Sequence, residues 1–378
     1  GRFGDIVQVD IPDFRFDIRQ LDDVELSDIT GDGLPDLVLD TGARDELWFF
    51  QNLGNYRFAP RRVITSSTYG EDSAVRWADM NGNGTTDVVY ADRRSMDRIA
   101  FIDIGELMNC VPSPNLLVRV ENGIGARTRI AYRGSAEYRI QDAREGREWP
   151  DPLPSAVDVV AEIVVDDLLG DFRTTRLRYH DGYYHVPLLE FAGFAEVEQA
   201  EIGDAEAPTL VTRFRFDTGR DTYQMRGNLL QQALETEDGR VFWRETHTWE
   251  DRILHTGADG HLVHFPHKTR TVREEIELGN GDPIQTETEF AYDNYGNMTA
   301  ERAYGTVADG DERIQQMEYA TNPAAWLLRF PSRTTLTDLD GNIVSRKETY
   351  YDDPAFTGQN FGFVSRGNDT MSRAWRDP

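Results

Sequence analysis

Two short segments of the sequence carry oxygen-bearing side chains at the same spacing. Positions 1, 3, 5 and 9 of each segment hold Asp, Asn or Thr, and position 6 is Gly. This pattern suits a hard cation that takes about six to eight oxygen ligands, with a backbone carbonyl supplied at position 7. The predicted calcium ligands are Asp28, Thr30, Asp32, Leu34 and Asp36 in the first loop, and Asp79, Asn81, Asn83, Thr85 and Asp87 in the second.

The two loops differ from an EF-hand and from each other. An EF-hand would need a bidentate Glu at position 12, where this sequence has Leu39 and Tyr90. The first loop offers three carboxylates and the second only Asp79 and Asp87, so we expect tighter calcium binding at the first. An Asx turn without a metal is the alternative for both loops, because Asp and Asn side chains can bond to the nearby backbone.

The histidines are interpreted as structural. A strand would point His264 away from His261 and His267, which argues against a shared metal ion, so these three and His255 are read as surface or packed side chains. His180 and His185 flank an Asp-Gly pair and are interpreted as hairpin-end side chains.

No enzyme is predicted. Nucleophile elbows, phosphate loops and dinucleotide fingerprints are absent from the sequence. The single cysteine, Cys110, excludes an internal disulfide and a cysteine-rich metal site. A glycoside-active enzyme ranks third among the function classes, because carboxylate pairs carry little information in a chain with 67 acidic residues.

The loops belong to a repeat with an offset of 51 residues. Ten positions correspond, from Val24 and Val75 to Val38 and Val89, and each copy runs from alternating apolar residues through the loop into a β-branched run. The first copy continues into a hairpin that ends near Phe58. A period near 50 residues is typical of one β-propeller blade, and two copies cannot close a ring of about four to eight blades.

The repeat stops after Cys110, and a proline-rich stretch at residues 111–114 predicts a boundary. We therefore expect propeller blades in residues 1–110 and a second β region in residues 111–378. Helical periodicity is nearly absent there, with residues 324–330 as the best short candidate, ended by Pro331. Hairpin turns are predicted at Asp181-Gly182, Asp238-Gly239, Asp259-Gly260, Asn280-Gly281, Asp309-Gly310 and Asp340-Gly341.

The charge of the chain limits its partners. Lys and Arg total 40 against 67 Asp and Glu, which gives a formal net charge of −27. Such a surface repels phosphate backbones and anionic lipid headgroups, so nucleic acid and direct membrane insertion are not expected. The sequence begins without Met or a signal segment, which suggests a fragment of a longer protein.

The loops and the hairpin at residues 50–58 resemble the FG-GAP or VCBS repeats of integrin-type propellers, over residues 20–105. Further segments at residues 121–128, 189–197 and 292–299 resemble the B component of bacterial Tc toxin complexes, and the last is a YD-type repeat as in RHS proteins. The resemblance implies an all-β fold, with partial β-propeller blades of the FG-GAP/VCBS type followed by a long antiparallel RHS-like β-sheet.

By the same resemblance, the chain would be a non-enzymatic scaffold of a secreted, extracellular toxin. The RHS-like part would form a shell around a toxic C-terminal polypeptide, and the propeller would dock to a translocation channel component. The competing expectation is an extracellular adhesion or carbohydrate-binding β-propeller protein.

Overall fold

The computed structural model describes residues 9–14, 24–30, 34–41, 46–65, 73–81, 86–92, 99–103, 116–277, 281–306 and 312–375. Strands dominate this part of the chain, which confirms the all-β prediction. The chain divides into two compact units, Gly1–Asp181 and Gly182–Pro378. The domain boundary predicted at residues 110 and 111 lies outside the described residues and stays a prediction.

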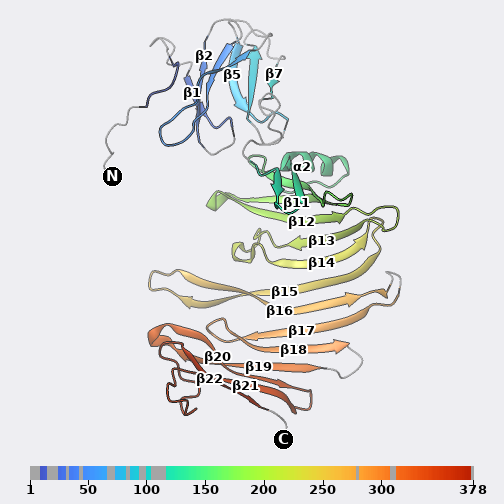
Figure 1. Ribbon diagram of the computed structural model, residues 1–378, viewed down its shortest axis with the longest axis vertical. Coiled ribbons are helices and arrows are strands. Elements are labelled where there is room, and N and C mark those ends of the chain that lie inside the picture. The colour runs from blue at the N-terminus through green and yellow to red at the C-terminus, as the bar shows by residue number, and fades with distance from the viewer. Residues whose placement is uncertain are drawn as a thin grey trace. The chain divides into compact units, whose positions relative to one another are not determined.

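The first unit begins with two small antiparallel sheets that correspond to the two repeats (Figure 1). Their strands pair in chain order, and each predicted calcium loop joins the first two strands of its sheet. Buried residues of both sheets, among them Phe49 and Val88, form one hydrophobic cluster. The strands are β1 (Val24–Ser27), β2 (Asp36–Asp40), β3 (Glu46–Phe50) and β4 (Arg62–Thr65), then β5 (Ser73–Ala78), β6 (Asp87–Asp92) and β7 (Ile99–Ile102).

The rest of the first unit contains a helix that the sequence analysis missed. Helix α2 (Ser135–Arg144) follows strand β9, with Glu137 in its first turn and Arg144 in its last, as the helix dipole favours. Only Ser135, Tyr138 and Asp142 of this helix are buried. The strands of this part pair in chain order: β8 (Arg119–Glu121), β9 (Arg127–Gly134), β10 (Asp158–Asp166) and β11 (Phe172–His185), the last of which crosses the unit boundary.

The second unit is an antiparallel meander in which each strand pairs with the next one along the chain. Among the described residues, three short 3-10 turns lie in the connections. The elements are η2 (Val186–Leu188), β12 (Glu190–Glu201), β13 (Leu210–Phe216), η3 (Tyr223–Met225), β14 (Leu229–Thr236), β15 (Val241–Thr256), β16 (Leu262–Glu275), β17 (Ile284–Tyr292), β18 (Met298–Thr306), β19 (Arg313–Asn322), η5 (Pro323–Ala325), β20 (Leu327–Thr337), β21 (Ile343–Tyr351) and β22 (Asp369–Trp375).

Two local predictions are wrong. Asp181-Gly182 is not a hairpin turn, because β11 continues through it to His185, with Asp181 at a positive φ of 52°. Residues 324–330 form a 3-10 turn and the start of β20 in place of a helix, and Pro331 lies within that strand. The turns at Asp238-Gly239, Asp259-Gly260 and Asp340-Gly341 are confirmed. Asn280 and Asp309-Gly310 lie outside the described residues.

The sheet of the second unit has no packed core along most of its length. Among its described residues the buried apolar side chains are few and scattered: Phe194, Val211, Ala233, Ala320, Tyr350, Tyr351 and Val364. Ala320, Tyr351 and Val364 form a cluster near the last strands. A β-sandwich would bury one whole face of each sheet, so this unit is a single layer. None of the described helices is long and apolar enough to cross a membrane.

Candidate functional site

The first predicted calcium loop is anchored by Asp36, the first residue of β2. Its Oδ2 accepts hydrogen bonds from the backbone N–H groups of Ile29 at 3.1 Å and Thr30 at 3.0 Å. Its Oδ1 accepts a third from the N–H of Asn52 at 2.8 Å. The side chain is fully buried, and burial raises the pKa of Asp36 although these three hydrogen bonds act to lower it.

The other members of the first loop lie around this anchor. Asp28 and Thr30 follow β1, and the backbone N–H of Thr30 donates a hydrogen bond to the Asp36 carboxylate. Leu34 is partly exposed on the way into β2, and Asp32 lies outside the described residues. Oδ2 of Asp36 already accepts two hydrogen bonds, whereas Oδ1 accepts one, so the second lone pair of Oδ1 leaves room for a cation contact.

The second loop repeats the same anchor. Asp87, the first residue of β6, is buried, and its Oδ2 accepts the backbone N–H of Met80 at 2.9 Å. Met80 stands 51 residues after Ile29, so the repeat is preserved at the level of hydrogen bonds. Asn81 donates from Nδ2 to Oδ2 of Asp103 at 2.6 Å. Asn83 and Thr85 lie outside the described residues.

Asp103 is a residue that the sequence analysis missed. It follows β7 and stands 51 residues after Asn52, the residue whose N–H reaches Asp36 in the first blade. An alignment of the two copies extended beyond residue 89 would have revealed it. The second blade thus places a carboxylate beside its loop where the first blade has an amide.

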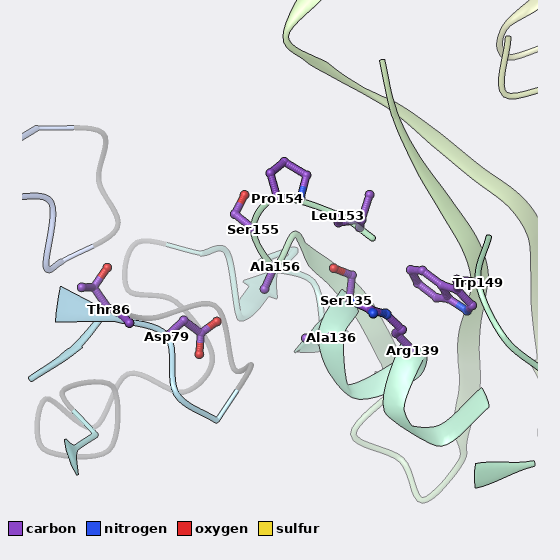
Figure 2. A pocket seen from close by; sticks show the side chains of 11 residues that line it. Asp79, Thr86, Ser135, Ala136, Arg139, Trp149, Leu153, Pro154, Ser155 and Ala156 are labelled. Carbon is purple, nitrogen blue, oxygen red and sulfur yellow. The ribbon is translucent and has the colours of Figure 1, made fainter. Parts of the chain in front are cut away.

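A pocket lies beside the second loop, with a volume of about 540 Å³. Figure 2 shows Asp79 and Thr86 of the blade on one side, and Ser135 and Arg139 of α2 on the other. The segment 153–156, Trp149, Ala78 and Ala136 complete the lining. This mixture of a carboxylate, a guanidinium group, hydroxyl groups and an indole selects no single class of ligand, so we assign the pocket no function.

A buried polar cluster holds α2 against β11. The fully buried carboxylate of Asp142 accepts hydrogen bonds from Trp149 Nε1 at 2.8 Å and Arg178 Nη2 at 3.1 Å. His180 Nδ1 lies 2.7 Å from Asp142 Oδ2. The interpretation of His180 as a hairpin-end side chain is therefore wrong, since it is buried within a strand. Its partner is 38 residues away, and no local pattern could have indicated it.

The histidines of β15, β16 and the turn between them have separate surroundings. His264 Nδ1 lies 2.6 Å from Asp251 Oδ2, His261 is exposed beside Asp259, and His267 stacks on Phe265 with ring centroids 4.9 Å apart. No grouping of metal-ligating atoms among the described residues includes His255, His261, His264 or His267. The expectation of surface or packed side chains is confirmed for His261, His264 and His267.

Ion pairs between neighbouring strands cover the sheet of the second unit. Arg213 on β13 contacts carboxylates of both adjacent strands, Glu196 Oε1 at 2.8 Å and Glu235 Oε1 at 2.8 Å. Farther along, Arg270 pairs with Glu287 at 2.5 Å. Arg333 reaches Glu318 at 2.9 Å and Glu348 at 3.0 Å. Arg333 lies directly opposite Glu318 and Glu348, and the partners of Arg213 and Arg270 lie diagonally opposite them, so each pair joins side chains of the same face.

Known proteins resemble both the sequence and the fold. Residues 51–219 match the family model of the insecticide toxin TcdB middle/N-terminal region, and residues 1–90 match the FG-GAP-like repeat. No curated protein matches the sequence. The crystal structure of TcdB2-TccC3 has a similar fold, with a TM-score of 0.75 and 16% identity over 96% of this chain and 23% of that chain.

Two further structures give similar values. The crystal structure of TcdB2-TccC3-Cdc42 also has a TM-score of 0.75 and 16% identity, over 96% of this chain and 23% of that chain. A Photorhabdus luminescens Tc holotoxin pore with mutated TccC3 has a TM-score of 0.75 and 16% identity, over 96% of this chain and 22% of that chain. The present chain thus spans less than a quarter of these chains.

At 16% identity the solved structures establish the shared fold alone, and the sequence models match residues 1–90 and 51–219. The order of the two matches, FG-GAP-like repeats followed by the TcdB region, is the order expected from the sequence. Over residues 51–219 the chain is similar to the middle/N-terminal region of TcdB insecticide toxins, which is consistent with a fragment of a Tc toxin B-type component.

Proposed function

We propose that this chain contributes a non-enzymatic scaffold to a secreted Tc-type toxin. In this proposal the sheet of the second unit is a segment of an RHS-like shell that encloses a toxic polypeptide. The two blades belong to the propeller that docks the shell to the translocation channel component. The observation that carries the proposal is a sheet with ion pairs on both of its faces.

The two faces are seen most clearly where β15 pairs with β16. Arg244 lies opposite Glu274, and their side chains approach to 3.5 Å. The next residue along the strand, Glu245, lies opposite Arg273, with a side-chain distance of 3.4 Å. Successive residues of a strand point to opposite faces, so each face carries an ion pair at this point. Charged side chains on both faces of the sheet suit the wall of a shell, which contacts solvent on its outer side and on its inner side.

A structure of the complete protein tests the proposal. The full-length product should be co-expressed with the second polypeptide of its toxin complex and imaged by electron microscopy. We expect a hollow body, and we expect the enclosed polypeptide to resist added protease until the shell is denatured. A solid body, or a second polypeptide that is digested at once, would contradict a shell.

Calcium binding by the two loops is the second part of the proposal. It is supported by the oxygen pattern of the loops and by the repeated anchors at Asp36 and Asp87. A ligand that binds only the folded state raises the unfolding temperature with its concentration. We therefore expect calcium to raise the midpoint of thermal unfolding relative to a chelator, and Asp28→Asn to reduce that shift more than Asp79→Asn. An unchanged midpoint would remove the metal from the proposal.

A further inference from the structure

The two blades of the first unit pack on each other through unlike faces. Alternate residues of a strand point to opposite sides of its sheet. In the first blade, Val38 of β2 lies opposite Phe49 of β3, so they share one face, and Leu47 lies on it two residues before Phe49. These three side chains are each 2% exposed. We call the face of a blade that this register defines its forward face, and the opposite face its rear face.

The second blade covers the forward face of the first blade with its own rear face. Val88 and Tyr90 of β6 lie on this rear face with Trp77 of β5, which is paired with Val88. All three pack in one hydrophobic cluster with the forward-face residues of the first blade. Trp77 Nε1 also donates a hydrogen bond to Glu25 Oε2 at 2.6 Å, and Glu25 lies opposite Val38. The interface therefore combines apolar packing with a polar bond.

The second blade has a forward face of its own. Val89 stands 51 residues after Val38 and is paired with Phe101 of β7, as Val38 is paired with Phe49. Ile99 lies on the same face, two residues before Phe101. The two blades therefore place large apolar side chains at equivalent positions of their forward faces.

The two forward faces differ in their exposure. Phe101 is 43% exposed, whereas its counterpart Phe49 is 2% exposed. Ile99 is 61% exposed, whereas its counterpart Leu47 is 2% exposed. The forward face of the first blade is covered by a blade, and that of the second presents the same kind of surface to solvent. Repeats of this size bury such faces by stacking on a neighbouring repeat.

Arg76 identifies the polar group that the forward face of the second blade requires. It lies opposite Val89, so it holds the position that Glu25 holds in the first blade. Two other charged residues that the described strands place on this face, Asp87 and Asp103, stand at its loop end. Asp87 is buried and accepts a backbone N–H, and Asp103 accepts a side-chain amide of the second loop. The exposed part of the face is therefore apolar, with a cation at its margin.

A second copy of the chain does not fit this face. The rear face of its second blade is covered by its first blade. The rear face of its first blade holds Leu39 and Phe50, both 0% exposed, and the ring of Phe14 lies 5.3 Å from that of Phe50. A copy of the second blade would also bring an indole N–H against Arg76, and both groups can only donate hydrogen bonds. The partner therefore needs an acceptor where the second blade has Trp77.

We propose that the forward face of the second blade, formed by Arg76, Val89, Ile99 and Phe101, docks a further blade of the same repeat type in the full-length protein. That blade presents an apolar rear face with a carboxylate at the position of Trp77, opposite Arg76. The contact repeats the one between the two described blades, with the donor and the acceptor of its polar bond exchanged. This inference rests on the proposed function, because it requires a propeller with more than two blades.

Photo-crosslinking of the full-length protein tests this docking face. Residue 101 is replaced by p-benzoylphenylalanine, which keeps an aromatic ring there, and cross-linked peptides are identified by mass spectrometry after irradiation. We expect an intramolecular cross-link to a strand next to another glycine-containing loop of the repeat type. The control places the same amino acid at residue 56, because Tyr56 is an aromatic residue between β3 and β4 that is 68% exposed. It should give no cross-link to another blade.

Substitutions in the full-length protein give a second measure. Phe101→Asp would bury a carboxylate in an apolar interface, so we expect the protection of β6 against hydrogen exchange to fall at least about tenfold. Arg76→Glu should also lower this protection, because it brings two carboxylates together, whereas Arg76→Lys keeps the cation and should retain most of it. Tyr56→Asp is the control at an exposed position and should leave β6 protected.

The outcomes separate this inference from the proposed function. A cross-link from residue 101 to another polypeptide, or no cross-link at all, overturns the docking face, as does unchanged protection in Phe101→Asp. A hollow full-length body that lacks the cross-link overturns this inference alone. An intramolecular cross-link to a blade within a solid body overturns the proposed shell and supports the docking face.

Discussion

Arg213 holds Glu235 through two hydrogen bonds to the same carboxylate oxygen, from Nε at 3.0 Å and from Nη2 at 2.8 Å. Its remaining nitrogen, Nη1, bonds to Glu196 on the opposite strand at 2.8 Å. Burial by itself would lower the pKa of Arg213, but the hydrogen bonds to Glu235 and Glu196 raise it above its ordinary value. One guanidinium group therefore joins β12, β13 and β14 across the sheet.

The first prediction is that Arg213→Met destabilises the second unit by about 2 to 3 kcal/mol, because it removes the guanidinium group that bonds to two mostly buried carboxylates, Glu196 and Glu235. Urea unfolding of the full chain measures the change. Arg176→Met is the control, since Arg176 is 62% exposed and pairs only with Glu162 among the bonds described. It should cost less than about 1 kcal/mol. Equal effects of the two substitutions would contradict the role of Arg213 as a hub.

The second prediction concerns the glycine of the β17–β18 turn. Gly296 has a φ of 80°, and a Cβ placed there would come within 3.0 Å of the ring of Phe265. Gly260, in the β15–β16 turn, has a φ of 84° with open space around it. Gly260→Ala should cost about 1 to 2 kcal/mol through its backbone alone. Gly296→Ala should cost more, because Phe265 must also move. Thermal unfolding of the two variants compares them, and an equal loss would show that Phe265 yields freely.

The third prediction follows from the carboxylate of Asp352. Hydrogen bonds from the N–H groups of Arg366 and Ser365 hold the pKa of Asp352 well below its ordinary value. A depressed pKa in the folded state stabilises the fold above the unfolded pKa of about 3.9, and this contribution is lost as the pH falls below it. Asp352→Asn should therefore reduce stability at neutral pH, and its difference from the wild type should shrink in acid. Unfolding midpoints at several pH values measure this, and a constant difference would contradict it.

Patterns of local origin were predicted well from the sequence. The repeat offset of 51 residues located both loops and the strands around them, because a loop of Asp and Gly between alternating apolar residues and a β-branched run is typical of two strands joined by a loop. Three Asp-Gly turns were placed correctly for the same reason. Asp181-Gly182 failed because Asp181 adopts its positive φ within a strand, which no dipeptide signal distinguishes from a turn.

Features that depend on distant residues could not be predicted. Helix α2 has only three buried residues, so its sequence shows little apolar periodicity. Asp142 and His180 lie 38 residues apart and meet only because α2 packs beside β11. The predicted calcium loops also combine a feature visible in the sequence with one that depends on distant residues. The sequence indicated Asp36 and Asp87, whereas their roles as acceptors of backbone N–H groups emerge only from the fold.

The last prediction separates the structural role of Asp36 from its proposed role in calcium binding. In Asp36→Asn the new amide group would place an N–H donor against an existing N–H donor, at Asn52 or at Ile29 and Thr30. The first blade should therefore lose about 1 to 3 kcal/mol even in a chelator. Hydrogen exchange of peptides from β1 to β4 measures this loss locally, with Asp10→Asn as a control at an exposed position. Asp36→Asn should also reduce the calcium-induced rise in protection of these peptides. If it lowered protection in the chelator yet left the calcium effect intact, Asp36 would be an anchor of the loop and not a ligand.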